Sequence, residues 1–406
     1  MYTNLHETFK NTPLGEEAKD IISNCVHCGF CTATCPTYQE LGDERDGPRG
    51  RIYLVKQLLE DGSATEKTRK HLDACLSCRS CETTCPSGVN YARLADLAKV
   101  VIEDQQTRPL KEQVVRWGIR KILPYPNRFT PLLRTGQWLK PLLPVAIKQK
   151  IPARVTPFGW PKSNHSRFML LLSSCGQAGA TPNTNAAAAN VMNHLGVKLV
   201  EAPKAGCCGA VSYHLSQHEE GLNFMRRNID AWWPSIEAGA EAIVMTASGC
   251  GAMVEDYGML LKDDKQYAAK AKRVSELTKD LSQVISVEDI KSLNLTADSL
   301  KTAVHCPCSL QHGMGLTNSV EPLLGAAGLT LSKTKDKHLC CGSAGTYSIL
   351  QPTMSKALLA NKIDALNIDA PDRIVTANVG CQLHIGTQSK VPVQHWIELI
   401  DQAIKR

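Results

Sequence analysis

The first hundred residues carry apolar positions at helical spacing. In the stretch GPRGRIYLVKQLLEDG, Pro48 stands near the start, Ile52 and Val55 recur about one turn apart, and Gly62 follows the end. A proline, an apolar stripe and a closing glycine in this order predict a helix. The stretches KTRKHLDAC and NYARLADLAKVVIED predict two further helices by the same spacing.

From residue 166 onward the pattern changes to short apolar runs that alternate with helical stretches. FMLLLSS, GVKLVEA and EAIVMTAS predict three strands, and KTAVHCP, GLTLSKT and DRIVTANV predict three more in the same order. The cysteines align the two sets at a nearly constant offset: Cys175 with Cys306, GCCGAVSYH with LCCGSAGTY, and Cys250 with Cys381. We therefore expect an internal repeat of two parallel α/β halves, with the cysteines at the carboxyl ends of the strands.

These patterns predict an α+β multidomain protein. A mostly helical domain should occupy 1–105, and two repeated α/β cysteine-rich halves should occupy 166–295 and 296–406. The basic segment 106–165 between them contains many prolines. We expect a connector there with little long regular structure.

The chain has 406 residues and 17 cysteines, no apolar run long enough to span a membrane, and a polar start. It should therefore remain in the cytosol, where thiols are kept reduced. So many cysteines in tight groups then favour metal or cluster ligation over a disulfide framework.

Two cysteine runs, CVHCGFCTATCP and CLSCRSCETTCP, share the spacing C-x-x-C-x-x-C-x-x-x-C-P. Three closely spaced thiolates can bind one face of an iron–sulfur cube, and in the bacterial-ferredoxin pattern the fourth ligand comes from the other run. Zinc is the alternative, but it prefers cysteines in two separate pairs. We therefore predict two [4Fe-4S] clusters, one on Cys25, Cys28, Cys31 and Cys85 and the other on Cys75, Cys78, Cys81 and Cys35. The helical domain of residues 1–105 is then a ferredoxin-like domain with two clusters.

The repeated halves hold the remaining cysteines. Converging thiolates there could bind a third cluster or zinc, and simple burial of free cysteines is the alternative. The candidates are Cys175, Cys207, Cys208 and Cys250 in the first half and Cys306, Cys308, Cys340, Cys341 and Cys381 in the second.

The sequence contains no dinucleotide-binding glycine fingerprint and no P-loop. Without a flavin or nicotinamide site, the chain has no evident way to accept a hydride from a substrate. We expect it to receive electrons from a partner subunit, and we assign no catalytic residue to it.

The two cysteine runs followed by paired CCG motifs resemble the iron–sulfur subunits associated with flavin-dependent 2-hydroxy-acid and glycerol-phosphate dehydrogenases. Within this group the chain is most similar to the iron–sulfur subunits of bacterial glycolate oxidases, through CVHCGFCTATCPTYQ, DGPRGRIYL, CETTCPSGV, NIDAWWP, TASGCG and HLCCGSAGTY. The CCG halves are similar to the repeats of heterodisulfide reductase, but Met253 and His384 stand where that family has the last cysteine of a CxxC pair.

The resemblance implies a subunit of an oxidoreductase complex that oxidises glycolate to glyoxylate with an acceptor other than NAD. Flavin-containing partner subunits would bind the substrate, and this chain would pass their electrons to a quinone or another acceptor. The same role for a D-lactate or glycerol-3-phosphate dehydrogenase is the main alternative.

The basic segment allows further readings. An iron–sulfur protein that binds nucleic acid through this segment is a distant alternative, but the segment has no recognisable nucleic-acid-binding signature, so we expect no nucleic-acid partner. Its mixture of Trp and Leu with Lys and Arg is typical of segments at a membrane surface, and an acidic partner subunit would suit it equally well. We expect a cytoplasmic protein that is peripheral to the inner membrane at most.

Overall fold

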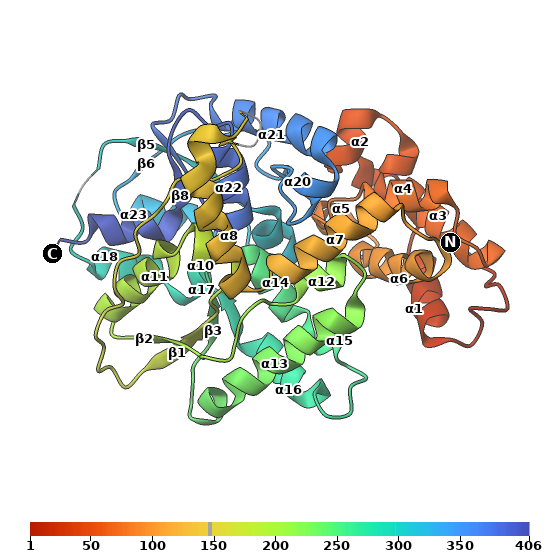
Figure 1. Cartoon of the computed structure of the whole chain (residues 1–406), viewed down its shortest axis with the longest axis horizontal. Helices are drawn as coiled ribbons and strands as arrows, with labels where there is room; N and C mark the ends of the chain where they lie inside the picture. Colours follow the sequence, from red (N-terminus) through yellow and green to blue (C-terminus); the bar gives the residue numbers. More distant parts are fainter. Residues whose placement is uncertain (145–147, 297, 406) are drawn as a thin grey trace. The chain divides into compact units, whose positions relative to one another are not determined.

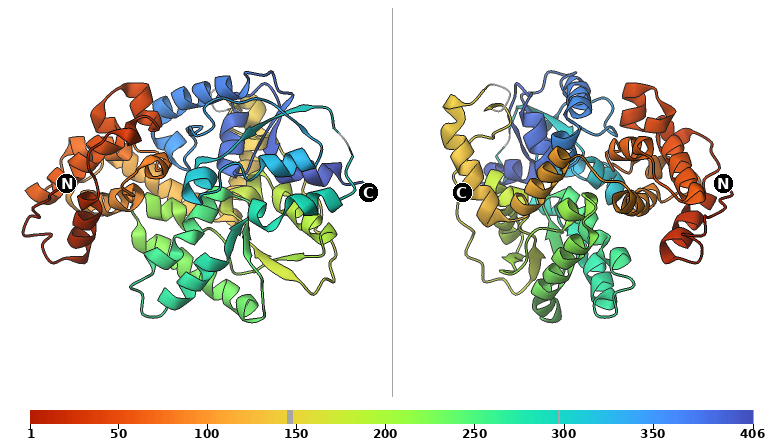
Figure 2. Two further views of the ribbon diagram at one scale, coloured as in Figure 1. Left: turned by 180° about the vertical axis from the view of Figure 1, so that it is seen from behind. Right: turned by 45° about the vertical axis from the view of Figure 1, so that its right-hand side comes forward.

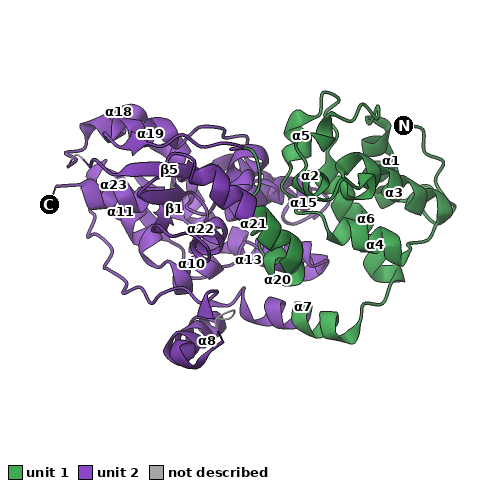
Figure 3. Ribbon diagram, turned by 90° about the horizontal axis from the view of Figure 1, so that it is seen from above, with its two compact units in different colours: residues 1–116, 338–358 green, residues 117–337, 359–406 purple. Residues whose placement is uncertain are grey.

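The computed structural model of the chain describes residues 1–144, 148–296 and 298–405, and Figure 1 labels most of its helices and strands. The chain forms two compact units, residues 1–116 with 338–358 and residues 117–337 with 359–406 (Figure 3). Helix α7, Leu110–Ile122, begins in the first unit and ends in the second. No helix of the described part combines the length and the apolar character that crossing a membrane requires.

The described part of the first unit is helical, as the sequence predicts. Its elements are α1 Pro13–Ser23, η1 Phe30–Thr32, α2 Pro36–Leu41, η2 Glu44–Asp46, α3 Pro48–Asp61, α4 Glu66–Asp73, α5 Ser80–Thr84, α6 Tyr91–Gln105 and α20 Tyr347–Leu350. Helix α3 begins at Pro48, whose missing N–H costs nothing in the first turn, and ends at Gly62, which adopts φ 73°. Ile22, Leu58 and Leu94 are fully buried where α1, α3 and α6 pack together.

The second unit contains two four-stranded parallel sheets with the same strand order, β2-β1-β3-β4 and β6-β5-β7-β8. The strands are β1 Phe168–Leu171, β2 Lys198–Glu201, β3 Ile243–Met245, β4 Thr278–Asp280, β5 Lys301–His305, β6 Thr330–Leu331, β7 Arg373–Thr376 and β8 Val393–His395. The six strands that the apolar runs predict are confirmed, and the repeated order supports the internal repeat. Strands β4 and β8 were not predicted, because both are short and lack an apolar run.

Helices precede, connect and follow the strands of both sheets; the first sheet can be followed in yellow and green in Figure 2. Before β1 lie α8 Pro126–Leu139 and η3 Lys140–Leu142, and after β8 lies α23 Trp396–Ala403. Between strands lie α10 Cys175–Ala180, α11 Asn183–His194, α12 Ala210–His214, α13 His218–Glu237, α14 Ser248–Glu255, α15 Tyr257–Leu260, α16 Ala268–Leu277, α17 Leu281–Val284, α18 Val287–Ser292, the π-helix η4 Ser309–Gly313, α19 Glu321–Ala326, α21 Pro352–Leu366 and α22 Val379–Gly386.

The two sheets share one hydrophobic core. Leu171 and Val244 of the first sheet and Val375 of the second are buried in it, together with Trp396 of α23. The backbone N–H of Ser248, shortly after β3, also donates to the backbone carbonyl of Ala377, which directly follows β7, at 3.1 Å. The carboxyl ends of the two sheets therefore meet inside the second unit.

The expectation of little regular structure in 106–165 is wrong for its first part. Helices α7 and α8 occupy much of it, because two of its prolines stand at helix starts, although Pro131 lies inside α8. Pro109 directly precedes α7, and Pro126 is the first residue of α8. A proline at these positions fits a helix, because its N–H would have no partner there. Residues 145–147 of the connector lie outside the described residues.

Candidate iron–sulfur sites

The two cysteine runs fold into equivalent loops. His27 and Gly29 of the first run have φ 57° and 88°, and Ser77 and Arg79 at the matching positions of the second have φ 52° and 60°. Left-handed residues turn the chain sharply, so that closely spaced cysteines can face a common point. The repeated spacing in the sequence therefore corresponds to a repeated backbone conformation. At Arg79, where the first run has a glycine, the left-handed conformation costs conformational energy.

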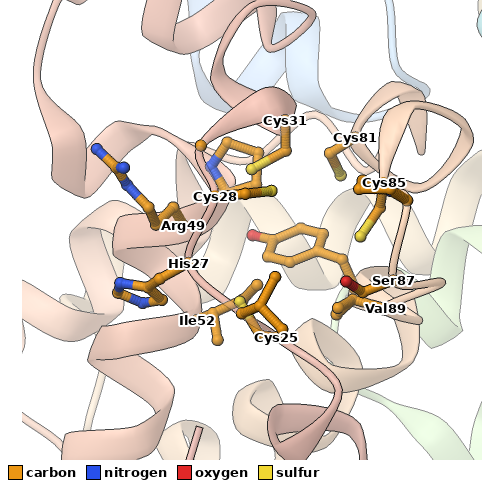
Figure 4. Close-up of a pocket in the computed structure, with 15 residues that line it drawn as sticks. Cys25, His27, Cys28, Cys31, Arg49, Ile52, Cys81, Cys85, Ser87 and Val89 are labelled. Carbon is orange, nitrogen blue, oxygen red and sulfur yellow. The ribbon is translucent and has the colours of Figure 1, made fainter.

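Cysteines from both runs line one pocket of the first unit. Cys25, Cys28, Cys31 and Cys85 lie around it with Cys81 beside them, and their sulfur atoms gather in Figure 4. The empty space is about 430 Å³ and opens to solvent. Burial, opposed by a backbone hydrogen bond and reinforced by the neighbouring cysteines, raises the pKa of the Cys31 thiol to about 11. We call Cys25, Cys28, Cys31 and Cys85 the first-run site.

The other four cysteines of the runs are electrostatic neighbours. Burial raises the pKa of Cys81 well above its usual value, and Cys78, Cys75 and Cys35 raise it further. Cys35 precedes α2 and Cys81 lies in α5, so two elements distant in the sequence contribute to one group. We call Cys35, Cys75, Cys78 and Cys81 the second-run site.

The chemistry of these residues suits iron–sulfur clusters. None of the 17 cysteines, all of which lie in the described part of the chain, forms a disulfide. Tyr91, which also lines the pocket, is buried, and its hydroxyl lies beside the Cys75 thiol. Burial and then Cys75 raise its pKa. Eight thiols and a buried hydroxyl beside one of them match the soft donors and the sulfur hydrogen bonding of cluster sites.

The first cysteine-rich half brings its four thiols into one group in the second unit. Cys175 begins α10 after β1, Cys207 and Cys208 follow β2, and Cys250 lies in α14 after β3. The thiol of Cys207 and then burial raise the pKa of Cys175 well above its usual value. The Cys208 thiol interacts with Cys207 and with Cys250, and its own pKa is also raised. Each thiol thus interacts with the next in the order Cys175, Cys207, Cys208 and Cys250.

Side chains that the sequence analysis did not single out fix the paired cysteines. Asn228 Nδ2 donates to the Cys207 carbonyl at 3.0 Å, and the Tyr257 hydroxyl donates to the Cys208 carbonyl at 2.8 Å. Both side chains are fully buried. Asn228 lies in the NIDAWWP stretch, whose asparagine could have indicated this role; Tyr257 gave no such signal. Met253, where the related repeats have a cysteine, packs in the core.

The cysteines of the second half are divided between the two compact units. Cys306, Cys308 and Cys381 belong to the second unit, and burial followed by Glu321 raises the pKa of Cys306 to about 12. Cys340 and Cys341 belong to the first unit with the rest of 338–358.

Within the first unit, this CCG segment lies against the second cysteine run. The Tyr347 hydroxyl donates to the Ala74 carbonyl at 3.0 Å, one residue before Cys75. Burial and then Cys75 raise the pKa of Tyr347, and Cys340 contributes too. No pattern in the sequence predicted this contact between the segment and the ferredoxin-type domain.

Known proteins match this architecture along the whole chain. The family model described as a 4Fe-4S dicluster domain matches residues 21–89, and the one described as a cysteine-rich domain matches 169–255 and 302–386. A solved structure titled a hypothetical protein from Helicobacter pylori has a TM-score of 0.57 at 10% identity, covering 98% of this chain and 74% of that chain, which shows a likeness of fold alone.

Two relatives extend over nearly the full length. The chain is 50% identical over 407 residues to the "Glycolate oxidase iron-sulfur subunit" of Escherichia coli (strain K12), covering 100% of both chains. It is 31% identical over 421 residues to the "Probable glycolate oxidase iron-sulfur subunit" of Bacillus subtilis (strain 168), covering 94% of this chain and 93% of that protein. The chain therefore belongs to the family of glycolate oxidase iron–sulfur subunits.

Proposed function

We propose that this chain is the iron–sulfur electron-transfer subunit of a complex that oxidises glycolate to glyoxylate. The observation that carries the proposal is the 50% identity to the Escherichia coli subunit over the whole of both chains. Partner subunits contain the flavin and bind the substrate. This chain takes electrons from that flavin and delivers them to a quinone or another acceptor.

The eight cysteines of the two runs are the ligands in this proposal. Cys25, Cys28, Cys31 and Cys85 of the first-run site hold one [4Fe-4S] cluster, and the second-run site holds the other. Each cluster supplies a reversible one-electron carrier. Support for the first set comes from its shared pocket, and support for the second comes from the mutual effect of its thiols on the pKa of Cys81.

The protein around the first-run site is open to a partner. Cys28 is exposed, and the neighbouring Val26 and Phe30 are 68% and 61% exposed. Electron transfer requires close approach, and exposed apolar side chains beside a redox site suit a contact with another protein. We infer that the flavin-containing partner delivers its electrons here.

The first cysteine-rich half holds a further metal centre, a third cluster or zinc, on Cys175, Cys207, Cys208 and Cys250. Three of these thiols are buried, and buried thiols with raised pKa values ionise readily only when a cation replaces the proton. For the second half, Cys306, Cys308, Cys340, Cys341 and Cys381 are candidate ligands on sequence grounds.

The proposal places the complex in the cytoplasm, with a peripheral contact to the inner membrane through α8 and η3. Residues 113–200 contain no Asp or Glu. Trp138 and Leu142 are 79% and 82% exposed in this basic stretch, which suits the surface of anionic lipids. Flotation of the complex with anionic vesicles tests this contact: wild-type protein should float, and a Trp138→Ala/Leu142→Ala variant should not. Ile368→Ala, which removes another exposed apolar side chain, is the matched control.

Metal analysis of the anaerobically purified complex tests the ligand proposal. Two clusters account for about eight irons per chain, a third raises the number to about twelve, and zinc in the first half would be measured directly. Cys85→Ser should alter the EPR signal of the first-run site and leave that of the second unchanged. A folded, active complex without iron would reject the proposal.

The substrate is tested separately on the same complex. Dye reduction should be fastest with glycolate, and deletion of this chain should abolish it. Faster reduction with D-lactate or glycerol 3-phosphate would keep the electron-transfer role and assign it to a different dehydrogenase.

A further inference from the structure

We propose that the buried guanidinium of Arg51 raises the reduction potential of the second-run site, so that electrons arriving at the first-run site move on to the second. The inference rests on the ligand assignment of the proposed function. One electron is transferred between the sites with no bond made or broken, and the reduced flavin of the partner subunit is its source.

Arg51 is held rigidly in the interior of the first unit. It lies on α3 with a side chain only 1% exposed. Its Nε donates to the His71 carbonyl at 2.7 Å, Nη1 donates to Thr37 Oγ1 at 3.1 Å, and Nη2 lies 3.4 Å from Asp46 Oδ1. Three partners from three segments fix the planar group in one orientation.

The guanidinium faces ligands of the second-run site. Burial opposes its charge, but Cys75 leads the groups that stabilise it and Cys35 is also among them, and their combined effect raises the pKa of Arg51. Thr37 links it to one of these thiols, because the Thr37 hydroxyl that accepts from Arg51 is 3.3 Å from Cys35 Sγ. The positive charge therefore lies beside the site, on a side chain that is almost fully shielded from solvent.

Asp46 compensates this charge incompletely. Its contact with Arg51 is long, and the same oxygen, Oδ1, is 2.9 Å from His71 Nδ1. Asp46 therefore neutralises Arg51 only in part, because the same carboxylate oxygen also contacts His71. Reduction of an iron–sulfur site adds one negative charge, and a desolvated cation nearby stabilises the reduced state more than the oxidised state. Asp46 acts in the opposite direction.

The cations near the first-run site differ from Arg51 in their partners. The Met1 ammonium donates to backbone carbonyls, among them that of Cys25 at 2.8 Å. Arg49 interacts more strongly with Glu44 than with Cys31. The arginine there, Arg49, has a side chain 32% exposed and pairs with Glu44 at 2.6 Å. In Figure 4 its guanidinium points away from Cys28 and Cys31. Solvent and the carboxylate screen this charge, whereas burial preserves that of Arg51. The difference makes the second-run site the better electron acceptor.

The direction of transfer agrees with the surroundings of each site. Cys28 of the first-run site is exposed, where a partner protein can approach. Cys75 of the second-run site lies next to Ala74, which binds Tyr347 of the segment that carries Cys340 and Cys341. Electrons therefore move from the exposed site toward the CCG segment of the first unit.

EPR-monitored redox titration of the reconstituted full chain tests the inference. Arg51→Gln should lower the equilibrium constant for reduction of one cluster about tenfold, which is about 59 mV for a one-electron couple, and should leave the other cluster within twofold. Asp46→Asn should shift the same signal in the opposite direction. Arg51→Lys, which keeps the charge, and Arg45→Gln, which removes an exposed one, should change neither signal by more than about threefold.

The affected signal is assigned to the second-run site by its alteration in Cys35→Ser. Unchanged potentials in an Arg51→Gln chain that retains both signals would overturn the inference and leave the proposed function standing. Should Arg51→Gln not retain the second cluster, Asp46→Asn decides: a shift to higher potential supports the inference, and no shift or a lower potential overturns it. A chain that binds no iron rejects the proposed function and this inference together.

Discussion

Gly209, which follows the paired cysteines of the first half, should be the most sensitive backbone position of that half. It adopts φ +92°, and a Cβ there would lie 2.8 Å from the carbonyl oxygen of Gly221 in the first turn of α13. Gly342 of the second CCG motif repeats this geometry, with φ +84° and the Ser355 carbonyl 2.6 Å away. The glycine of each motif therefore allows the loop with the cysteines to approach the backbone of the following helix closely.

Gly209→Ala combines two separable costs. A left-handed conformation costs a residue other than glycine roughly 1–2 kcal/mol. The contact with Gly221 adds the cost of overpacking, typically about 1–3 kcal/mol, since a backbone carbonyl cannot rotate away as a side chain can. Gly239 provides the matched control, because it has φ +95° and nothing within 4 Å of a Cβ. We expect losses in the free energy of unfolding of about 1–2 kcal/mol for Gly239→Ala and about 2–5 kcal/mol for Gly209→Ala.

Urea denaturation under anaerobic conditions measures this difference. Tryptophan fluorescence, to which the fully buried Trp232 of α13 contributes, reports unfolding. Gly209→Ala should also lower the metal content of the first half, because displacement of the loop moves Cys207 and Cys208. If the two variants differ by less than about 0.5 kcal/mol, the close approach to Gly221 carries no cost and the reasoning fails.

Two further predictions concern buried charges. Arg108 is 5% exposed and pairs with three carboxylates of the first unit, so Arg108→Met should cost about 3–5 kcal/mol of unfolding free energy. Arg167→Met, which breaks an exposed pair with Glu241, should cost only about 0–1 kcal/mol. Similar losses for the two variants in urea denaturation would contradict this prediction. Burial, opposed by hydrogen bonds from Ser282, raises the pKa of Asp280 to about 6 from 3.8, so the folded chain keeps this proton to higher pH than the unfolded chain. Stability should therefore fall by about 1 kcal/mol between pH 5.5 and 8, and Asp280→Asn should remove that slope; an unchanged slope in the variant would refute the assignment.

The sequence by itself determined most of the secondary-structure elements. Apolar runs predicted six of the eight strands of the described residues, and proline and glycine predicted the start and end of α3. The repeated cysteine spacing predicted that the two runs are equivalent, and their backbones repeat the same left-handed positions. These features depend on residues close together in the chain, where steric preference and periodicity act directly. Helices α7 and α8 were not predicted, because Pro109 and Pro126 stand at helix starts and α8 contains Pro131 in its interior.

Only the tertiary structure decided which side chains surround the thiols. Arg51 on α3 interacts electrostatically with Cys35 and Cys75 because it is hydrogen-bonded to α2 and to the end of α4. Asn228 in the middle of α13 donates to the Cys207 carbonyl. The place of Tyr347 beside Ala74 joins segments 273 residues apart. Such contacts depend on how separate elements pack, and a single sequence contains no periodic signal for them. Spacing along the chain predicts the ligands, and packing places the charged and hydrogen-bonding side chains beside them.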